Sequence, residues 1–291
     1  MVCEIKNLVN GIVWGEALRW RGNKLYWSDI MGKRVMRTDM DGNVEKLADI
    51  DAMPSGLGFL PDASLLIVSA GNNKLMRWTE SGLSEYTDIG GLSAGVNDMV
   101  VDRNGNAYIG AYGFDITKYE GGDAAGWIIL AKPGEKPKIV ANDIGLKSPN
   151  GIVITADGKT LIVADTIGKQ IIAFDIQVDG NLANGRPWAN MEHGPDGICM
   201  DTDGAIWAAI PNNSEVVRVV EGGKLLERIR LNGTPLCCTL GGDNRKTLFV
   251  VTVPVHNKLS SADLSNPEKQ QAKAGSKIDM VQVLVPGAGL P

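Results

Sequence analysis

Short apolar segments alternate with polar turns along the chain, and one arrangement of segments recurs six times. Each repeat opens with two apolar segments joined by a turn rich in Gly, Asn and Asp, and a third apolar segment follows after a polar loop. Two apolar runs joined by such a turn are typical of a β-hairpin. The opening pairs of segments occupy residues 16–30, 56–70, 97–112, 150–166, 196–211 and 237–253.

The length of the repeats predicts the fold. Successive repeats begin 40 to 53 residues apart, which accommodates four short strands, and no segment keeps the i, i+3, i+4, i+7 spacing of an amphipathic helix over three turns. Six four-stranded sheets around one axis predict an all-β fold, a six-bladed β-propeller, with residues 1–291 as a single domain. The last repeat lacks an outermost strand. We expect residues 3–9 (CEIKNLV) to supply it and to join the two ends of the chain.

Composition and charge narrow the function classes. The 36 glycines among 291 residues follow no period of three and indicate many tight turns. The formal net charge of −5, with no basic run, argues against nucleic acid or an anionic membrane as a partner. Residues 1–11 lack the features of a signal peptide and no apolar run reaches 18 residues, so a cytoplasmic protein is expected.

Two local patterns that suggest catalysis or metal binding have simpler explanations. The four cysteines show no C-x-x-C spacing, so reduced thiols in the core are expected at Cys3, Cys199, Cys237 and Cys238. The segment GLSAG at 91–95 matches the elbow of serine hydrolases, which requires a following helix. A strand-like segment follows instead, so a connection between blades is favoured over a nucleophilic Ser93.

Polar residues stand where four of the predicted innermost strands begin: Glu16, Asn97, Asn150 and Asp196. In an antiparallel hairpin the first strand starts at the edge where the second strand ends, and the connecting turn lies at the opposite edge. The four side chains are therefore expected to converge on the axis at one face of the propeller. Two carboxylates and two amides offer hard oxygen ligands, which suit Ca²⁺, Mg²⁺ or Mn²⁺.

Several longer segments resemble a known superfamily, that of senescence marker protein (regucalcin), gluconolactonase and luciferin-regenerating enzyme. They are WGEALRW with LYWSDI, VNDMVVDRNGNAYIG, SPNGIVITADGKTLIVADT, GPDGICMDTDGAIWAA, and CCTLGG with LFVVT. The resemblance implies a six-bladed propeller with Glu16, Asn150 and Asp196 as ligands of one divalent metal ion. Ca²⁺ is the first expectation, with Mg²⁺, Mn²⁺, Zn²⁺ and Fe²⁺ as alternatives, and Asn97 resembles a residue that contacts metal or substrate.

The segments around this face differ from the family pattern in one respect. Regucalcin-like members carry an Arg where this chain has Gly95, which puts sugar-acid recognition of that kind in doubt.

Tyr112 begins a long loop in the third repeat, and His256 opens a polar loop at 256–277; both are expected at the same face, as substrate-binding residues beside Asn97. The 256–277 loop is interpreted either as a lid or as an excursion without a role. His193 is expected to have a surface role rather than one in proton transfer.

The resemblance predicts a metal-dependent hydrolase that opens a lactone, with a sugar-derived lactone as the first substrate. The metal would polarise the carbonyl, and Asp196 or a metal-bound hydroxide would serve as the base. The expected partner is a small lactone or ester; the oligomeric state is left open. Alternatives are an arylesterase or organophosphate hydrolase on the same metal, a non-catalytic calcium-binding propeller, and a serine hydrolase acting through Ser93.

Overall fold

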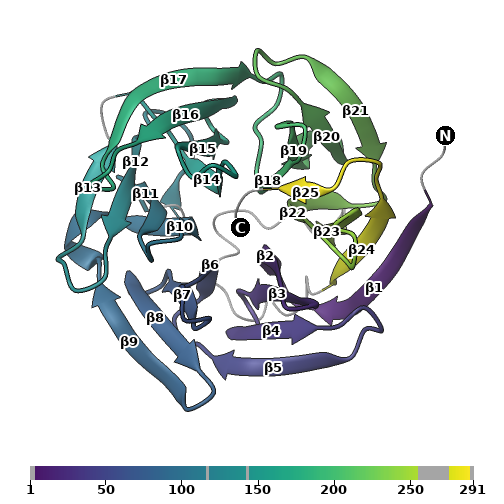
Figure 1. Cartoon of the computed structure of the whole chain (residues 1–291), viewed down its shortest axis with the longest axis horizontal. Coiled ribbons are helices and arrows are strands. Elements are labelled where there is room, and N and C mark those ends of the chain that lie inside the picture. The colour runs from purple at the N-terminus through teal and green to yellow at the C-terminus, as the bar shows by residue number, and fades with distance from the viewer. Residues whose placement is uncertain (1–3, 116–117, 142–143, 255–274, 289–291) are drawn as a thin grey trace.

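Six sheets surround a central axis and form a six-bladed β-propeller (Figure 1), as the repeats predict. The computed structural model describes residues 4–115, 118–141, 144–254 and 275–288. The 3-10 helices η1 (Gly90–Leu92) and η3 (Pro211–Asn213) interrupt the strands, and the described residues contain no α-helix. No helix in this part of the chain is long and apolar enough to span a bilayer.

In the first five blades, four consecutive strands run outward from the axis in chain order. The first three blades consist of β2 (Gly15–Arg21), β3 (Lys24–Asp29), β4 (Arg34–Thr38) and β5 (Val44–Asp49); β6 (Pro54–Phe59), β7 (Leu65–Ser69), β8 (Lys74–Thr79) and β9 (Gly82–Asp88); and β10 (Gly95–Val101), β11 (Ala107–Tyr112), β12 (Gly126–Ala131) and β13 (Lys138–Ala141). The fourth and fifth consist of β14 (Pro149–Ile154), β15 (Thr160–Asp165), β16 (Gln170–Ile176) and β17 (Leu182–Asn190); and β18 (Ile198–Asp201), β19 (Ile206–Ile210), β20 (Glu215–Val219) and β21 (Leu225–Arg230).

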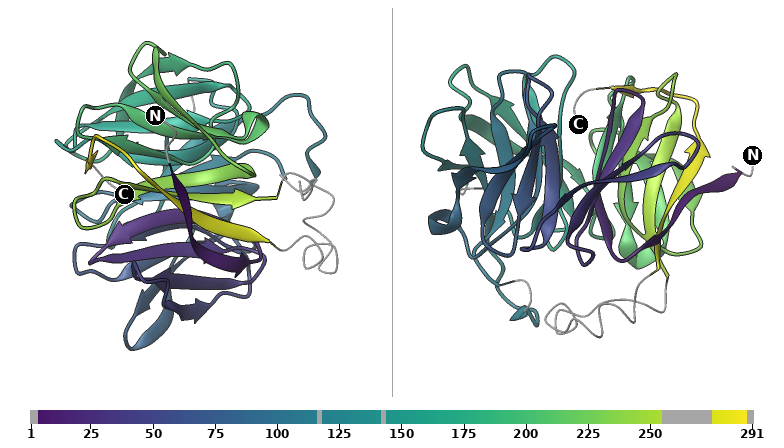
Figure 2. Two further views of the ribbon diagram at one scale, coloured as in Figure 1. Left: turned by 90° about the vertical axis from the view of Figure 1, so that its right-hand side faces the viewer. Right: turned by 90° about the horizontal axis from the view of Figure 1, so that it is seen from below.

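The sixth blade joins the two ends of the chain, as expected from residues 3–9. It contains β22 (Thr234–Gly241), β23 (Thr247–Val253) and β24 (Ser276–Gln282), and its outermost strand is β1 (Ile5–Ile12), which pairs antiparallel with β24. Figure 2 shows these two strands side by side at the edge of the ring. One further strand was not predicted: β25 (Gly287–Ala288) pairs with β18 on the inner edge of the fifth blade. This pairing attaches the end of the described chain to a second blade.

The hydrophobic core lies between neighbouring blades. One cluster combines Val153 and Ile171 of the fourth blade with Ile206 and Val217 of the fifth. Both faces of a middle strand are therefore covered, and all five residues of β7 are buried. Burial on both faces explains why strands such as β7 appear in the sequence as continuous apolar runs rather than as alternating patterns.

Candidate functional site

Irregularities in the innermost strands turn polar side chains toward the axis. The pairing register between first and second strands shifts at the start of five blades, between Glu16 and Arg19, Pro54 and Leu57, Val96 and Met99, Pro149 and Ile152, and Pro235 and Cys237. Such bulges release residues from the ladder and redirect their side chains. Asn97 and Asn150 lie inside two of them. In the fifth blade Asp196 comes just before β18, and its N–H donates to Ala209 O at 2.9 Å.

Glycines that follow the polar residues let neighbouring blades approach closely. A Cβ atom on Gly151 would lie 2.5 Å from the backbone nitrogen of Ile198, and one on Gly197 would lie 2.4 Å from Cβ of Cys237. The N–H of Gly151 instead donates to Asp196 O at 3.2 Å. The Asn-Gly and Asp-Gly pairs at the strand starts therefore bring Asn150 and Asp196 together across the boundary between two blades.

The structure brings Glu16, Asn150 and Asp196 into one electrostatic cluster. Burial is the main cause that raises the pKa of Glu16 to about 7, and the neighbouring charge of Asp98 raises it further. Burial, followed by the charges of Glu16 and Asp98, raises the pKa of Asp196 well above its usual range, and a hydrogen bond with Asn150 opposes the shift. These carboxylates are thus held together in a poorly solvated space where negative charge is disfavoured.

A divalent cation fits this donor set. Oδ1 of Asp196 is buried and has no hydrogen-bond partner within the described residues, so one hard oxygen ligand is left unused. A nearby cation would offset the repulsion between Glu16 and Asp196. No three His, Cys, Asp or Glu side chains form a metal-binding group in the described part of the chain. The predicted set would add an amide oxygen, that of Asn150, to the two carboxylates.

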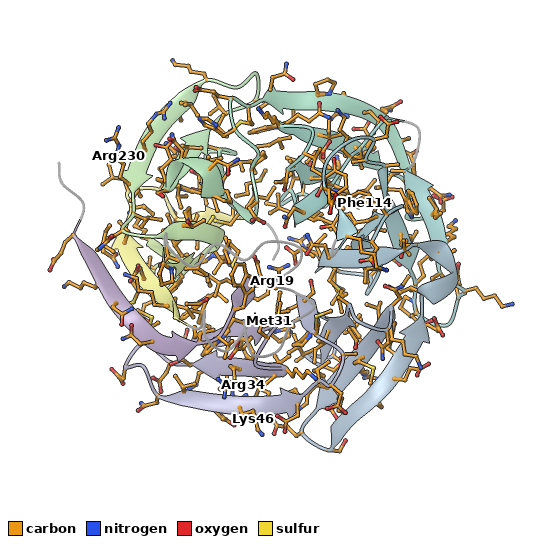
Figure 3. All side chains as sticks on the ribbon, turned by 180° about the vertical axis from the view of Figure 1, so that it is seen from behind. Arg19, Met31, Arg34, Lys46, Phe114 and Arg230 are labelled. Carbon is orange, nitrogen blue, oxygen red and sulfur yellow. The ribbon has the colours of Figure 1, made fainter. Side chains whose placement is uncertain are left out.

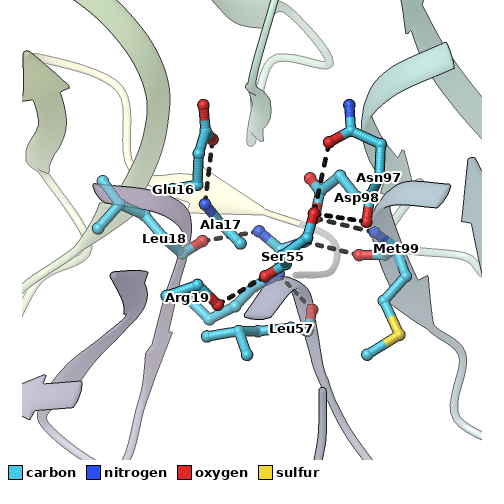
Figure 4. A network of polar contacts seen from close by, with 10 residues as sticks. Glu16, Ala17, Leu18, Arg19, Ser55, Leu57, Asn97, Asp98 and Met99 are labelled. Carbon is cyan, nitrogen blue, oxygen red and sulfur yellow. Dashed lines mark hydrogen bonds and ion pairs between the residues drawn. The ribbon is translucent and has the colours of Figure 1, made fainter. Parts of the chain in front are cut away.

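Beneath these groups lies an ion pair that the sequence analysis missed. Nη2 of Arg19 contacts Oδ1 of Asp98 at 2.7 Å, and the same guanidinium donates to the backbone carbonyls of Leu18, Leu57 and Met99. Figure 4 shows Glu16 and Asn97 on one side of this network and Arg19 on the other. The signal in the sequence was a pair of charged residues inside apolar inner strands.

Asn97 and Tyr112 lie around the same centre. Ser55 Oγ, a second group that the sequence analysis missed, lies 2.9 Å from Asn97 O and 3.4 Å from Asn97 Oδ1. Tyr112 is 5% exposed at the end of β11, and burial is the main cause that raises the pKa of its phenol. The charges of Asp196 and Glu16 contribute to that shift, which places Tyr112 within their field.

His193 and Ser93 lie outside this cluster. His256 lies outside the described residues. His193 lines a separate small cavity with Glu215 and Arg228, and its imidazole lies 3.7 Å from Glu192. Ser93 follows η1 and precedes β10, and its Oγ is buried without a hydrogen-bond partner among the described residues, so no base is seen to activate it.

The cysteines are free and buried at Cys199, Cys237 and Cys238, as expected for three of the four; Cys3 lies outside the described residues. Burial raises the pKa of the Cys237 thiol well above its usual range, which disfavours a thiolate nucleophile. Cys237 instead forms a hydrogen bond with Glu16. The thiol therefore lies beside the Glu16 carboxylate in a setting that disfavours its ionisation.

The molecule is thus a six-bladed propeller whose inner strands hold carboxylates and amides at one end of the axis. Residues 14–254 match the family described as SMP-30/Gluconolactonase/LRE-like region, and the chain belongs to this family. Regucalcin of Gallus gallus is 25% identical over 249 residues, covering 82% of this chain and 81% of its own. L-arabinolactonase of Azospirillum brasilense is 27% identical over 259 residues, covering 83% of this chain and 81% of its own. This named lactonase connects the family with lactone hydrolysis.

A solved structure agrees in fold over nearly the full length. Regucalcin of Agrobacterium tumefaciens, described as a calcium-binding protein, superposes with a TM-score of 0.76 at 21% identity, covering 97% of this chain and 94% of its own. At this identity the likeness shows the six-bladed fold and leaves the site residues to be argued from the geometry above.

Proposed function

We propose that this protein is a metal-dependent hydrolase that opens a lactone, with a sugar-derived lactone as the first substrate class. Glu16, Asn150 and Asp196 would hold one divalent cation, Ca²⁺ first among the candidates. The observation that carries the proposal is the buried, unpartnered Oδ1 of Asp196, which lies in the field of the Glu16 carboxylate. The lactonase among the relatives supports the reaction, and the calcium-binding regucalcin supports the cation.

The chain's own residues supply the proton chemistry. A bound cation would polarise the lactone carbonyl and stabilise the charge that develops on its oxygen. The Asp196 carboxylate, or a hydroxide on the cation, would accept the proton of the attacking water. Oxygen from that water would bond to the carbonyl carbon, the ring C–O bond would break, and the base would return its proton to the departing oxygen to give a hydroxy acid. The amide of Asn97 and the phenol of Tyr112 would orient the substrate.

The test compares metal binding and hydrolysis in matched variants. Chelator-treated protein is refilled with individual divalent ions, titrated calorimetrically, and assayed on a panel of sugar lactones. Asp196→Asn and Glu16→Gln keep the size of the side chain and should lower hydrolysis by at least about 100-fold, whatever metal is added. Asp157→Asn, in an exposed turn between β14 and β15, is the control and should retain activity.

The possible results separate the alternatives. The proposal would be supported if added metal restores lactone hydrolysis in the unaltered protein but not in Asp196→Asn. Hydrolysis that persists after chelation and in both variants would reject it. Saturable Ca²⁺ binding with no turnover of any lactone or ester would favour the non-catalytic propeller instead.

A second substrate class is favoured by one feature of the third blade. Tyr112 stacks on Phe114 with ring centroids 5.4 Å apart, and a Cβ atom on Gly95 would lie 3.6 Å from the Tyr112 ring. The space beside Gly95 is thus bordered by an aromatic pair rather than by the guanidinium of regucalcin-like members. Aryl esters or organophosphates would pack against such rings, so they belong in the same panel, and faster turnover of these than of sugar lactones would favour this class.

A further inference from the structure

A cavity of about 600 Å³ opens at the end of the axis opposite to Glu16 and Asp196. Its rim is formed by the turns that join first and second strands in four blades, after β2, β6, β10 and β22. Those turns lie at the edge of each sheet remote from the first-strand starts. The volume lies in the range of small-molecule pockets. This cavity is therefore distinct from the candidate metal centre.

The cavity gathers arginines that lack acidic partners. Seven of the eleven arginines form an ion pair with a carboxylate. Within the described part of the chain the other four form none: Arg21, Arg103, Arg230 and Arg245. Three of these four line this one cavity, whereas Arg230 lies at the rim of the molecule in Figure 3. In a chain of net charge −5, this is a local concentration of unpaired positive charge.

The remaining charged groups of the cavity do not neutralise it. Arg19 also lines it, but its charge is matched by Asp98. Asp102 accepts hydrogen bonds from Asn106 and from the backbone of Asn104, and it forms no ion pair with an arginine among the described residues. Asp243 is exposed at the rim.

The three guanidinium groups retain unused donors. Nε of Arg245 is buried and has no hydrogen-bond partner within the described residues. Among the described residues, the Arg103 guanidinium makes one hydrogen bond, from Nη2 to Ala156 O at 2.9 Å. The Arg21 guanidinium makes one long hydrogen bond there, to Leu60 O, and lies 4.8 Å from the centre of the Phe59 ring. Each guanidinium has five N–H donors, so most of them are available to an acceptor. Carboxylate and phosphate oxygens match this geometry best.

The walls between the arginines are apolar and aromatic, formed by Trp20, Phe59, Leu60, Pro61 and Val101. Trp20 is supported from behind by Phe249, at 5.4 Å between ring centroids. We propose that this cavity binds a small organic anion, a carboxylate or phosphate monoester that carries an aromatic or similarly flat apolar group. The arginines hold the anionic head, and Trp20 and Phe59 contact the apolar body.

The experiment uses 1-naphthoate and phenyl phosphate as probes, titrated calorimetrically into the full chain at low ionic strength. Inorganic phosphate tests the anionic group alone, and the neutral 1-naphthalenemethanol tests the aromatic group alone. Arg103→Gln combined with Arg245→Gln removes two of the unpaired charges, and Arg230→Gln removes an unpaired charge outside the cavity. Circular dichroism and melting temperature verify that each variant is folded.

One saturable site is expected for at least one organic anion. Its affinity should fall about tenfold or more in the double variant and change less than about twofold in Arg230→Gln. High salt should also lower the affinity for the anion. The better probe tells whether carboxylate or phosphate is preferred. Binding should persist with chelator and in Asp196→Asn, which separates it from the metal-dependent hydrolase. No saturable binding, equal weakening by Arg230→Gln, equal affinity for the neutral alcohol, or loss in Asp196→Asn would each overturn the proposal.

Discussion

Removing the guanidinium of Arg19 should destabilise the protein because its ion partner is buried. The side chains of Arg19 and Asp98 are 5% and 13% exposed, and Nη2 and Oδ1 lie 2.7 Å apart. Arg19→Met introduces an apolar side chain of similar length and leaves Asp98, among the described residues, with one hydrogen bond, from the Met99 N–H at 2.8 Å. It also leaves the carbonyls of Leu18, Leu57 and Met99 without this donor.

The expected loss follows from the cost of an uncompensated buried charge. Removing one partner of a buried ion pair typically lowers the free energy of unfolding by about 3–5 kcal/mol, whereas replacing both partners by apolar groups is often close to neutral. Arg19→Met should fall in that range, and adding Asp98→Leu should recover about 2 kcal/mol or more of it. Arg37→Met, which breaks an exposed pair with Glu45, should cost at most about 1 kcal/mol.

Urea unfolding of chelator-treated protein measures these differences. The unaltered chain, Arg19→Met, Asp98→Leu and the double variant form a double-mutant cycle that isolates the coupling between the two side chains. The reasoning is refuted if Arg19→Met costs no more than Arg37→Met. A double variant less stable than Arg19→Met would refute it as well, because the buried carboxylate would not then be the source of the loss.

Three further predictions concern the inner strands. Folding raises the pKa of Glu16 to about 7, so the folded protein binds this proton more tightly than the unfolded chain does. The melting temperature of metal-free protein should therefore fall as pH rises from about 4.5 to 7, and the fall should be smaller in Glu16→Gln. An identical pH profile in that variant would count against this prediction. Gly151→Ala should cost about 1–3 kcal/mol in urea unfolding because its Cβ would meet the backbone of Ile198, while Gly91→Ala, with open space around it, should stay near neutral. Cys237→Ala removes a hydrogen bond to Glu16 and should weaken Ca²⁺ binding about tenfold by calorimetry; unchanged affinity would show that the thiol does not position the carboxylate.

The candidate site was predictable in part from local pattern. Glu16, Asn150 and Asp196 each stand at the start of an inner strand, and strand starts of one hairpin type share a face, so their convergence follows from topology. Arg19, Asp98 and Ser55 were not predicted, because their importance depends on contacts across blades. Arg19 and Asp98 are 79 residues apart in the chain, and no periodic pattern links them. His256, expected at the same face, lies outside the described residues.

The sequence by itself determined the number of blades, the strand-rich class and the closure by the N-terminal strand. These depend on short-range rules: apolar runs of strand length, turn residues between them, and an unpaired edge that favours a partner. Only the tertiary structure decided the bulges, the pairing of β25 with β18, the charge network beneath Glu16 and the gathering of unpaired arginines at the far face. The physical reason is that a guanidinium or carboxylate acquires its solvation, its partners and its pKa from residues that the chain brings near only on folding.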